Sequence, residues 1–357
     1  MSEVNVDLMN NGKGQGEVAQ MLMANGRMDI GAYRPFIYKG KTFISAYVSG
    51  DPAQKESYKV MQVNTNGTLR RDEWKALDAA VLKISENRLN GIQSLISNGL
   101  THNLGNAMGT TVLETHDMSS VEGAEMTMDG ISRSKGDRVE FSTTYLPIPI
   151  IHFDYEINTR VLAASRNMGN PLDTTMAERG ARVVSEKLEN ILFTDTTYAF
   201  GGGTIYSYLN NPNRNTVAIG TDWASASGDV IVTKVRALKQ AAIDAKHYGP
   251  YELYIPTAYE TALDKDYDST TPGTTIRERI LKISGISDIK VVDTLTAANV
   301  LLVQMTSDVV RLVRGMGIQN VQWQAEGTFV NKFKVMTIQV PQVRADQDGN
   351  SGIVHAS

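Results

Sequence analysis

The feature that most limits how this chain can fold is a regular apolar stripe within residues 172–194. Its small and apolar side chains recur at steps of three and four, as on one face of an α-helix. They are Ala177, Ala181, Val184, Leu188, Ile191 and Leu192. At its start, Thr175 and Glu178 have the spacing of a capping box, and Glu178 and Arg182 have that of an ion pair. The pattern predicts a helix of about 20 residues, or ~30 Å.

Other helical and strand patterns follow one another irregularly along the chain. An amphipathic helix is expected over residues 71–99, with its apolar face at Trp74, Leu77, Val81, Ile84, Ile92 and Leu95. After residue 229 we expect a helix, and then two more that begin at Thr257 and Thr275, each with a glutamate at capping-box spacing. Strands are expected at 251–256, 288–294, 299–305, 309–313 and 332–343. This mixture predicts an α+β fold rather than a doubly wound α/β sheet.

Two segments lack an apolar pattern of their own. Residues 1–70 contain short strand-like runs between turns, and we expect this arm to lie against another surface, such as another chain. Residues 121–147 read as two strands around a turn, a ribbon with few large apolar residues. A two-stranded ribbon is marginally stable alone and needs a partner surface.

Composition excludes several classes of function. The 357 residues favour two or three domains. The chain has no cysteine, so disulfides and cysteine-based zinc sites are excluded and a reducing cytosol is the natural setting. A net charge of −4 argues against a surface built to grip nucleic acid. No run approaches 18 apolar residues, so no membrane span is expected.

Three metal-ligand residue types, His152, Asp154 and Glu156, stand two positions apart. On a strand, side chains two apart share a face and lie ~6.6 Å apart, so His152 and Glu156 are ~13 Å apart and cannot share one ion. The residues between them are apolar, which predicts a half-buried strand with a polar outer face. Pro147 and Pro149 cannot donate ladder hydrogen bonds, so the entrance to this strand is expected at a sheet edge or unpaired.

The remaining candidates for chemistry are weaker. There is no G-x-S-x-G nucleophile elbow. Asp264, Asp266 and Asp268 imitate part of a calcium loop but lack its glycine and closing glutamate, so a solvated turn fits better. Trp74 and Trp323 fit packing roles. We therefore expect no enzymatic activity and no catalytic, metal or cofactor site.

Six segments stand in an order that resembles the major capsid proteins of tailed bacteriophages, with the Hong Kong ninety-seven-type fold, and the related encapsulin shell proteins. The resemblance runs from about Asp72 to Val343. The segments are "RDEWKALDAAVLKISENRLNGIQSLI", "YLPIPIIHFDYEINTRVL", "LDTTMAERGARVVSEKLENILFTD", "IYSYLNNPN", "YGPYELYIPTAYETAL" and "TTIRERILKISGISDIKVVDTL". Each is weak alone, but their order is specific.

The resemblance implies a division of the chain into named parts. They are an N-terminal arm (1–70), an amphipathic helix and connection (71–120), an extended β-hairpin loop (121–147), a peripheral domain (148–219 and 316–343) with a long spine helix, an axial domain (220–315) and a C-terminal tail (344–357).

The resemblance also implies a function. The chain would be a structural protein, a major capsid subunit that self-assembles into the icosahedral shell around a phage genome. Its partners would be its own copies, in pentamers and hexamers, with scaffolding, portal or decoration proteins. Packaged DNA would touch the inner face without specificity, and no membrane would be involved. The protein would belong to the virion and assemble in the host cytoplasm.

In such a shell the extended loop would contact a neighbouring subunit. The expected contact residues are Arg133, Lys135, Asp137, Arg138 and Phe141. Some relatives join a loop lysine covalently to an asparagine of a neighbour. Lys135 and Asn331 stand in comparable regions, but their spacing does not establish such a pair.

Two alternatives remain open from the sequence. The first is an encapsulin-type nanocompartment shell, although the long arm and the extra tail favour a viral capsid. The second, of another class, is a metal-dependent hydrolase that uses His152 and Asp154. Packaged DNA, a co-purifying enzyme or stoichiometric bound metal would separate the three.

Overall fold

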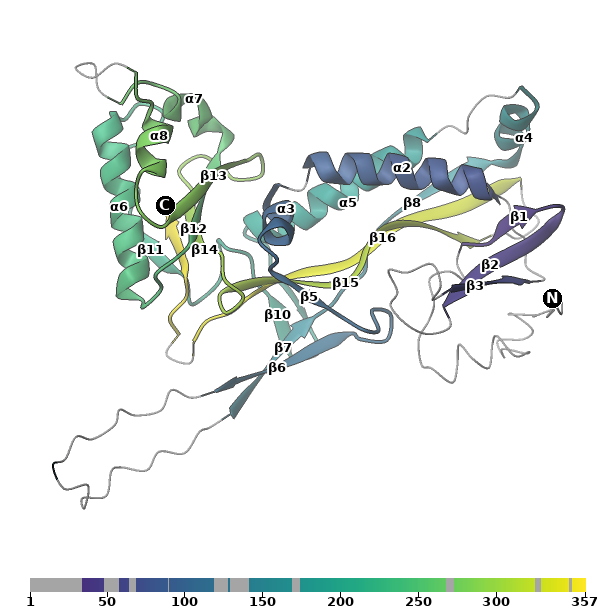
Figure 1. Cartoon of the computed structure of the whole chain (residues 1–357), viewed down its shortest axis with the longest axis horizontal. Coiled ribbons are helices and arrows are strands. Elements are labelled where there is room, and N and C mark those ends of the chain that lie inside the picture. The colour runs from purple at the N-terminus through teal and green to yellow at the C-terminus, as the bar shows by residue number, and fades with distance from the viewer. Residues whose placement is uncertain are drawn as a thin grey trace.

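The computed structural model describes residues 34–47, 58–63, 69–88, 90–118, 128, 141–168, 174–267, 273–324, 329–346 and 349–357. These residues form an elongated unit and, at one end of it, a second unit built on a five-stranded sheet (Figure 1). Within this part of the chain, no helix has the length and hydropathy to cross a bilayer.

The elongated unit is built on a four-stranded sheet with helices on one face (Figure 1). Its order is β5 (Thr101–Asn103), β15 (Val310–Gln324), β16 (Val330–Val343) and β8 (Ile151–Asn158). β16 is antiparallel to both of its neighbours. α2 (Arg71–Arg88) and α5 (Thr175–Phe193) cover one face, where Trp74, Leu77 and Val81 of α2 meet Ala177, Ala181 and Val184 of α5 and Tyr155, Phe333 and Val335 of the sheet.

α5 confirms the predicted helix, because five of the six stripe residues are buried and Ile191 is half-buried. Its local contacts differ from the prediction. The N-cap is Thr174, whose hydroxyl donates to Glu178 at 3.0 Å. Arg182 pairs with Glu186 at 2.8 Å rather than with Glu178, which Thr174 already engages.

The helix expected over 71–99 is two helices, α2 and α3 (Asn90–Ser97). The break follows Arg88, where a charge interrupts the apolar stripe. Asn90 donates its side-chain amide to the carbonyl of Val291 in the second unit, at 3.3 Å, so α3 is drawn away from the axis of α2. Ile92 and Leu95 of α3 are buried, as expected.

The opposite face of the sheet is covered by a two-stranded ribbon and a small hairpin. The ribbon pairs β6 (Val112–Met118) with β7 (Phe141–Pro147), and the hairpin pairs β9 (Tyr198–Phe200) with β10 (Gly203–Ile205). Leu146, Ile148 and Ile205 bury this face against Val313, Ile338 and Val340. The sequence placed residues 112–118 in a connection, which is wrong, whereas the first strand it expected, 124–130, lies outside the described residues but for position 128.

The described part of the N-terminal arm belongs to the fold of its own chain. It forms a sheet of β1 (Phe36–Tyr38), β2 (Lys41–Tyr47), β3 (Tyr58–Gln62) and β4 (Leu69–Arg70). Phe36 and Leu69 are buried in the same core as Trp74, whose indole N–H donates to Pro35. This part of the arm therefore packs against another surface, as expected, and that surface belongs to its own chain. α4 (Thr159–Met168) follows β8 nearby.

The second unit has the strand order β11 (Asn215–Val217), β17 (Ile353–Ala356), β14 (Val300–Gln304), β12 (Tyr251–Pro256) and β13 (Ile286–Val292). α6 (Gly228–Asp244) and α8 (Ile276–Leu281) pack on one face. Thr275 caps α8 by accepting from the Glu278 N–H at 3.2 Å, as expected. Thr257 is no cap: it begins the short 3₁₀ helix η3 (Thr257–Tyr259), capped by Pro256, before α7 (Glu260–Leu263).

The last residues are not a tail outside the fold. β17 is fully buried between β11 and β14. His355 accepts from Arg214 at 3.4 Å and contacts the Asn299 side chain at 2.8 Å. Burial lowers the pKa of His355, and the Arg214 charge lowers it further. A strand that pairs on both sides holds the C-terminus inside the sheet.

The buried stripe of α5 generates a stability prediction. Leu188→Ala should lower the free energy of unfolding of dissociated subunits by ~2–5 kcal/mol, because Leu188 is fully buried and leaves a cavity. Denaturant unfolding followed by circular dichroism measures the change. Arg179→Ala, at an exposed position of the same helix, should stay within ~0.5 kcal/mol of the parent. A loss at Leu188 no larger than that of the control would contradict the packing.

Candidate interface and the junction between the units

His152, Asp154 and Glu156 lie on the exposed face of β8, which confirms the predicted half-buried strand. β8 is an edge strand, as the two prolines indicate. Asp154 pairs with His152 at 3.3 Å and with Lys334 at 3.4 Å, and Lys332 lies 4.0 Å from Glu156. These are exposed ion pairs, which contribute little to stability. Among the described residues, no three His, Asp or Glu side chains are grouped as metal ligands.

The base of the ribbon carries exposed apolar side chains, which we call the ribbon-base patch. Its members are Tyr145, Ile150, Tyr198, Phe200 and Tyr206. Phe200 is 55% exposed and Tyr198 is 49% exposed. The hairpin that carries them fits closely against β7, because a Cβ on Gly203 would overlap the Tyr145 carbonyl oxygen. Glycine at this position therefore brings separate segments into one surface.

An apolar groove adjoins the patch. It lies between α5 and the start of β8 and has a volume of about 490 Å³. Ile150 and Tyr198 of the patch line it, together with Val183 on α5. Contiguous exposed apolar surface of this kind marks binding sites on soluble proteins. Ile150 and Tyr198 belong to both the patch and the groove, so we treat the two together as the candidate interface beside the start of edge strand β8.

The charged residues expected to contact a neighbour cannot be placed. Arg133, Lys135, Asp137 and Arg138 lie outside the described residues, and so does the side chain of Phe141, whose backbone pairs with Met118. Their role in an interface stays a prediction. Asn331 is buried in its own chain, where its amide donates to the Thr159 hydroxyl at 3.1 Å.

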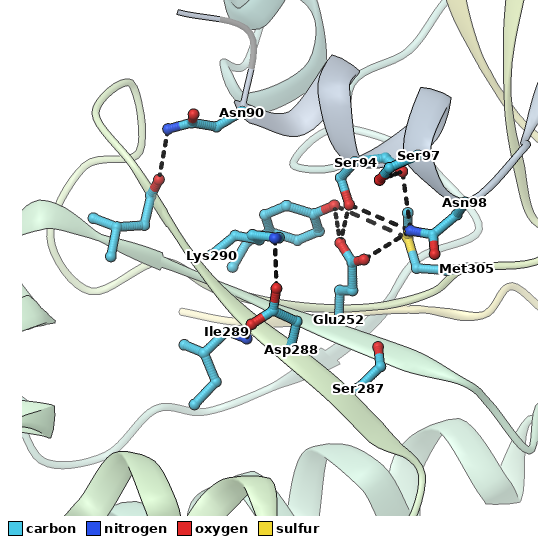
Figure 2. A network of polar contacts seen from close by, with 12 residues as sticks. Asn90, Ser94, Ser97, Asn98, Glu252, Ser287, Asp288, Ile289, Lys290 and Met305 are labelled. Atoms are coloured by element: carbon cyan, nitrogen blue, oxygen red, sulfur yellow. Dashed lines mark hydrogen bonds and ion pairs between the residues drawn. The ribbon is translucent and has the colours of Figure 1, made fainter. Parts of the chain in front are cut away.

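The two units meet at α3, where a buried polar network joins them (Figure 2). Glu252 of β12 is 4% exposed and accepts three hydrogen bonds. The donors are the Ser94 hydroxyl, the Asn98 amide at 2.8 Å and the Tyr254 hydroxyl at 2.9 Å. Because Ser94 and Asn98 come from α3 and its C-terminal end, this carboxylate ties the second unit to the helix. Its two oxygens are satisfied, as a buried carboxylate requires.

A second carboxylate holds the other end of α3. Glu189 of α5 accepts from the Gly91 N–H at 3.0 Å and is 6% exposed. Burial raises the pKa of Glu189 to about 7, even though the N–H groups of Gly91 and Ile92 lower it, and the nearby Asp293 charge raises it further. α3 therefore hydrogen-bonds to one carboxyl group from each unit, Glu189 of the elongated unit and Glu252 of the second unit.

Aromatic rings fill the space around these carboxylates. The ring of Phe193 lies 5.5 Å from that of Tyr208 and 5.0 Å from that of Tyr254. Burial raises the pKa of both tyrosines well above the ordinary value, and Glu252 adds to the effect. Both phenols therefore stay neutral, which suits a dry contact between the two units.

Sequence reasoning missed this junction. Ser94 and Glu252 are 158 positions apart, so no local spacing connects them. One signal was present. In the strand Tyr251–Pro256 a charged residue stands among apolar ones, and a buried strand rarely carries an unpaired charge.

Comparisons with known proteins place this geometry in context. The profile of a family described as "Family of unknown function (DUF6260)" matches residues 64–356. A type 1 encapsulin shell protein, EncA, from Myxococcus xanthus (strain DK1622) is 26% identical over 209 residues, which are 57% of this chain and 66% of that protein. This chain thus matches slightly less than two thirds of that relative.

Solved structures share the fold at low identity. A virus-like particle from Pyrococcus furiosus has a TM-score of 0.58 at 16% identity, over 80% of this chain and 99% of that chain. The capsid of Myoviridae phage XM1 has a TM-score of 0.58 at 11% identity, over 74% of this chain and 90% of that chain. The likeness confirms the predicted α+β capsid-type fold.

The buried network generates a prediction. Glu252→Ala should lower the free energy of unfolding by ~2–3 kcal/mol, because two buried donors, Ser94 and Tyr254, and the amide of exposed Asn98 lose their acceptor. Ser94→Ala should cost only ~1 kcal/mol, since Glu252 keeps Asn98 and Tyr254. Denaturant unfolding measures both. Glu260→Ala, an exposed glutamate of the same unit, is the control and should change little. Equal effects at positions 252 and 260 would contradict a buried network.

Proposed function

We propose that this chain, which belongs to the DUF6260 family, is a structural protein that assembles with copies of itself into a closed shell. The observation that carries the proposal is the ribbon-base patch, an exposed aromatic surface in a fold that a virus-like particle and a phage capsid share. A monomer would leave this surface in water, whereas neighbouring subunits would bury it.

We assign the parts of the subunit by this proposal. The elongated unit corresponds to the peripheral domain, with α5 as its spine, and the unit around β12 corresponds to the axial domain near the symmetry axes. The β6–β7 ribbon begins the extended loop. In Figure 1 its described strands lead away from the elongated sheet, as an arm toward a neighbour would.

The occupant that we assign to the patch and groove is the extended loop of a neighbouring copy. The loop's Arg133, Lys135, Asp137 and Arg138 would meet the mixed charges along β8 and β16, and Phe141 would add apolar contact. Such charges fix register and specificity more than affinity. The apolar patch would supply most of the binding free energy.

Between the two kinds of shell, we propose a phage capsid, with an encapsulin-type compartment as the alternative. The capsid would enclose the genome in the virion after assembly in the host cytoplasm, with scaffolding, portal or decoration proteins as further partners. The encapsulin relative keeps the compartment open as an alternative. The buried C-terminal strand removes the tail as an argument for the capsid. DNA inside purified particles would favour the capsid, and a co-purifying enzyme would favour the compartment.

The first test is assembly itself. Light scattering and negative-stain images should show closed particles far larger than the 39.1 kDa chain. Phe200→Asp should give soluble subunits without closed particles, because it puts a charge at the most exposed member of the patch. Particles from Phe200→Asp at the normal yield would exclude the patch as an interface.

Two controls separate assembly from folding. Phe200→Tyr keeps the aromatic ring and should assemble normally. The thermal midpoint of Phe200→Asp subunits should match that of dissociated parent subunits, because the side chain is exposed. A lowered midpoint would mean that the substitution damages the fold instead.

The loop contact predicts a difference in proteolysis. Trypsin should cut after Arg133, Lys135 or Arg138 at least tenfold more slowly in assembled particles than in dissociated subunits, because a neighbour covers the loop. Mass spectrometry of the fragments measures each rate. Cleavage after Arg236, on an exposed face of α6, is the internal reference for changes in protease activity. Equal rates at the loop sites in both states would contradict the loop contact.

A further inference from the structure

The Glu189 carboxyl, which holds the N-terminal end of α3, is only partly hydrogen-bonded. The second oxygen of Glu189, Oε2, is buried and has no hydrogen-bond partner among the described residues. The Tyr208 hydroxyl is buried and unpartnered in the same region. A buried carboxylate that is only half satisfied is costly when ionised and much less so when protonated.

Among the residues whose side chains the structure describes, the groups that face Glu189 supply no compensating positive charge. The segment after β13 brings Asp293, and the segment after β10 brings Tyr208. β12 brings Glu252 and Tyr254 to the same aromatic cluster. All of these side chains are acids or neutral phenols. From α3 itself come only backbone N–H groups, of Gly91 and Ile92.

The unpartnered oxygen is enclosed where α3 packs on α5. A Cβ on Gly91 would overlap the ring of Phe193 and the side chain of Leu192, so helix and spine are in direct contact. Hydration of an ionised Glu189 therefore requires α3 to move away from α5. Because Glu252 holds the same helix, that movement would loosen the contact between the two units.

We propose that α3 is a proton-controlled latch between the two units, closed when the Glu189 carboxyl is protonated and loosened when it ionises. The latch belongs to the single subunit, so it does not depend on assembly. As a consequence, the relative orientation of the two units is less rigidly fixed at alkaline pH.

The direction of the pH dependence follows from linkage. Glu189 has a pKa of about 7 in the folded chain and an ordinary value of 4.5 when exposed. The folded state therefore binds the proton more tightly than the open state does. The latch is most stable at acidic pH, weakens as the pH rises from about 4.5 to about 7, and changes little above that range.

Hydrogen exchange at the α3 amides tests the latch in the full-length protein. The rates at residues 91–95 in the parent are compared with those in Glu189→Gln at the same pH, which cancels the intrinsic pH dependence of exchange. Gln keeps an acceptor for the Gly91 N–H but cannot ionise. We expect similar rates near about pH 4, below the ordinary pKa of a glutamate, and at least ~10-fold faster exchange in the parent near about pH 8.

Two further variants keep the test decisive if Glu189→Gln folds poorly. Asp293→Asn removes a neighbouring negative charge and so lowers the pKa of Glu189. The α3 amides of this variant should therefore exchange more slowly than those of the parent at alkaline pH. Glu186→Gln, an exposed carboxyl on the same helix, should leave the α3 rates unchanged. A parent-to-variant ratio that stays constant across this pH range would overturn the proposal, whether or not the protein forms shells.

Discussion

The arrangement of the whole subunit depends on the grip that two carboxylates exert on one short helix. Glu189 holds the first turn of α3 from the spine, and Glu252 holds its C-terminal half from the second unit. Hydrogen bonds to buried carboxyl groups are directional, so they fix an angle as well as a distance. Without them the two units would be joined at α3 by apolar surface and by the exposed hydrogen bond from Asn90 to the Val291 carbonyl, which constrain orientation less.

The second unit can take part in this grip because of strand alternation. Tyr251, Leu253 and Ile255 of β12 point to the core under α6, whereas Glu252 and Tyr254 point to α3 and the spine. Because side chains alternate with a period of two, one strand contributes to two different packed surfaces. The same rule explains β8, whose odd-numbered residues enter the core while its even-numbered residues stay in water.

The parts of the fold that could be predicted are those with local periodicity. α5 repeats its apolar residues over 19 positions, so tertiary contacts reinforce what the sequence already favours. β6 was missed because it carries few apolar residues, and β17 because it is only four residues long. Their pairing depends on β7 and β14, which are distant in sequence. The junction was missed for the same reason, because Ser94 and Glu252 are distant in sequence and hydrogen-bond only in the folded chain.

The junction and the groove use different faces of the same spine helix, α5, one buried within the chain and one open. On the side of its C-terminal end, α5 buries Glu189 and Phe193 within the chain. Val183 instead lines the open groove next to Ile150 and Tyr198. One end is therefore covered by folding, whereas the groove side is open in the single chain and would be covered by a neighbour under the proposed assembly. A contact made in the groove therefore touches α5, the helix that also carries Glu189. This shared helix is the physical route by which a neighbouring subunit would influence the angle between the two units.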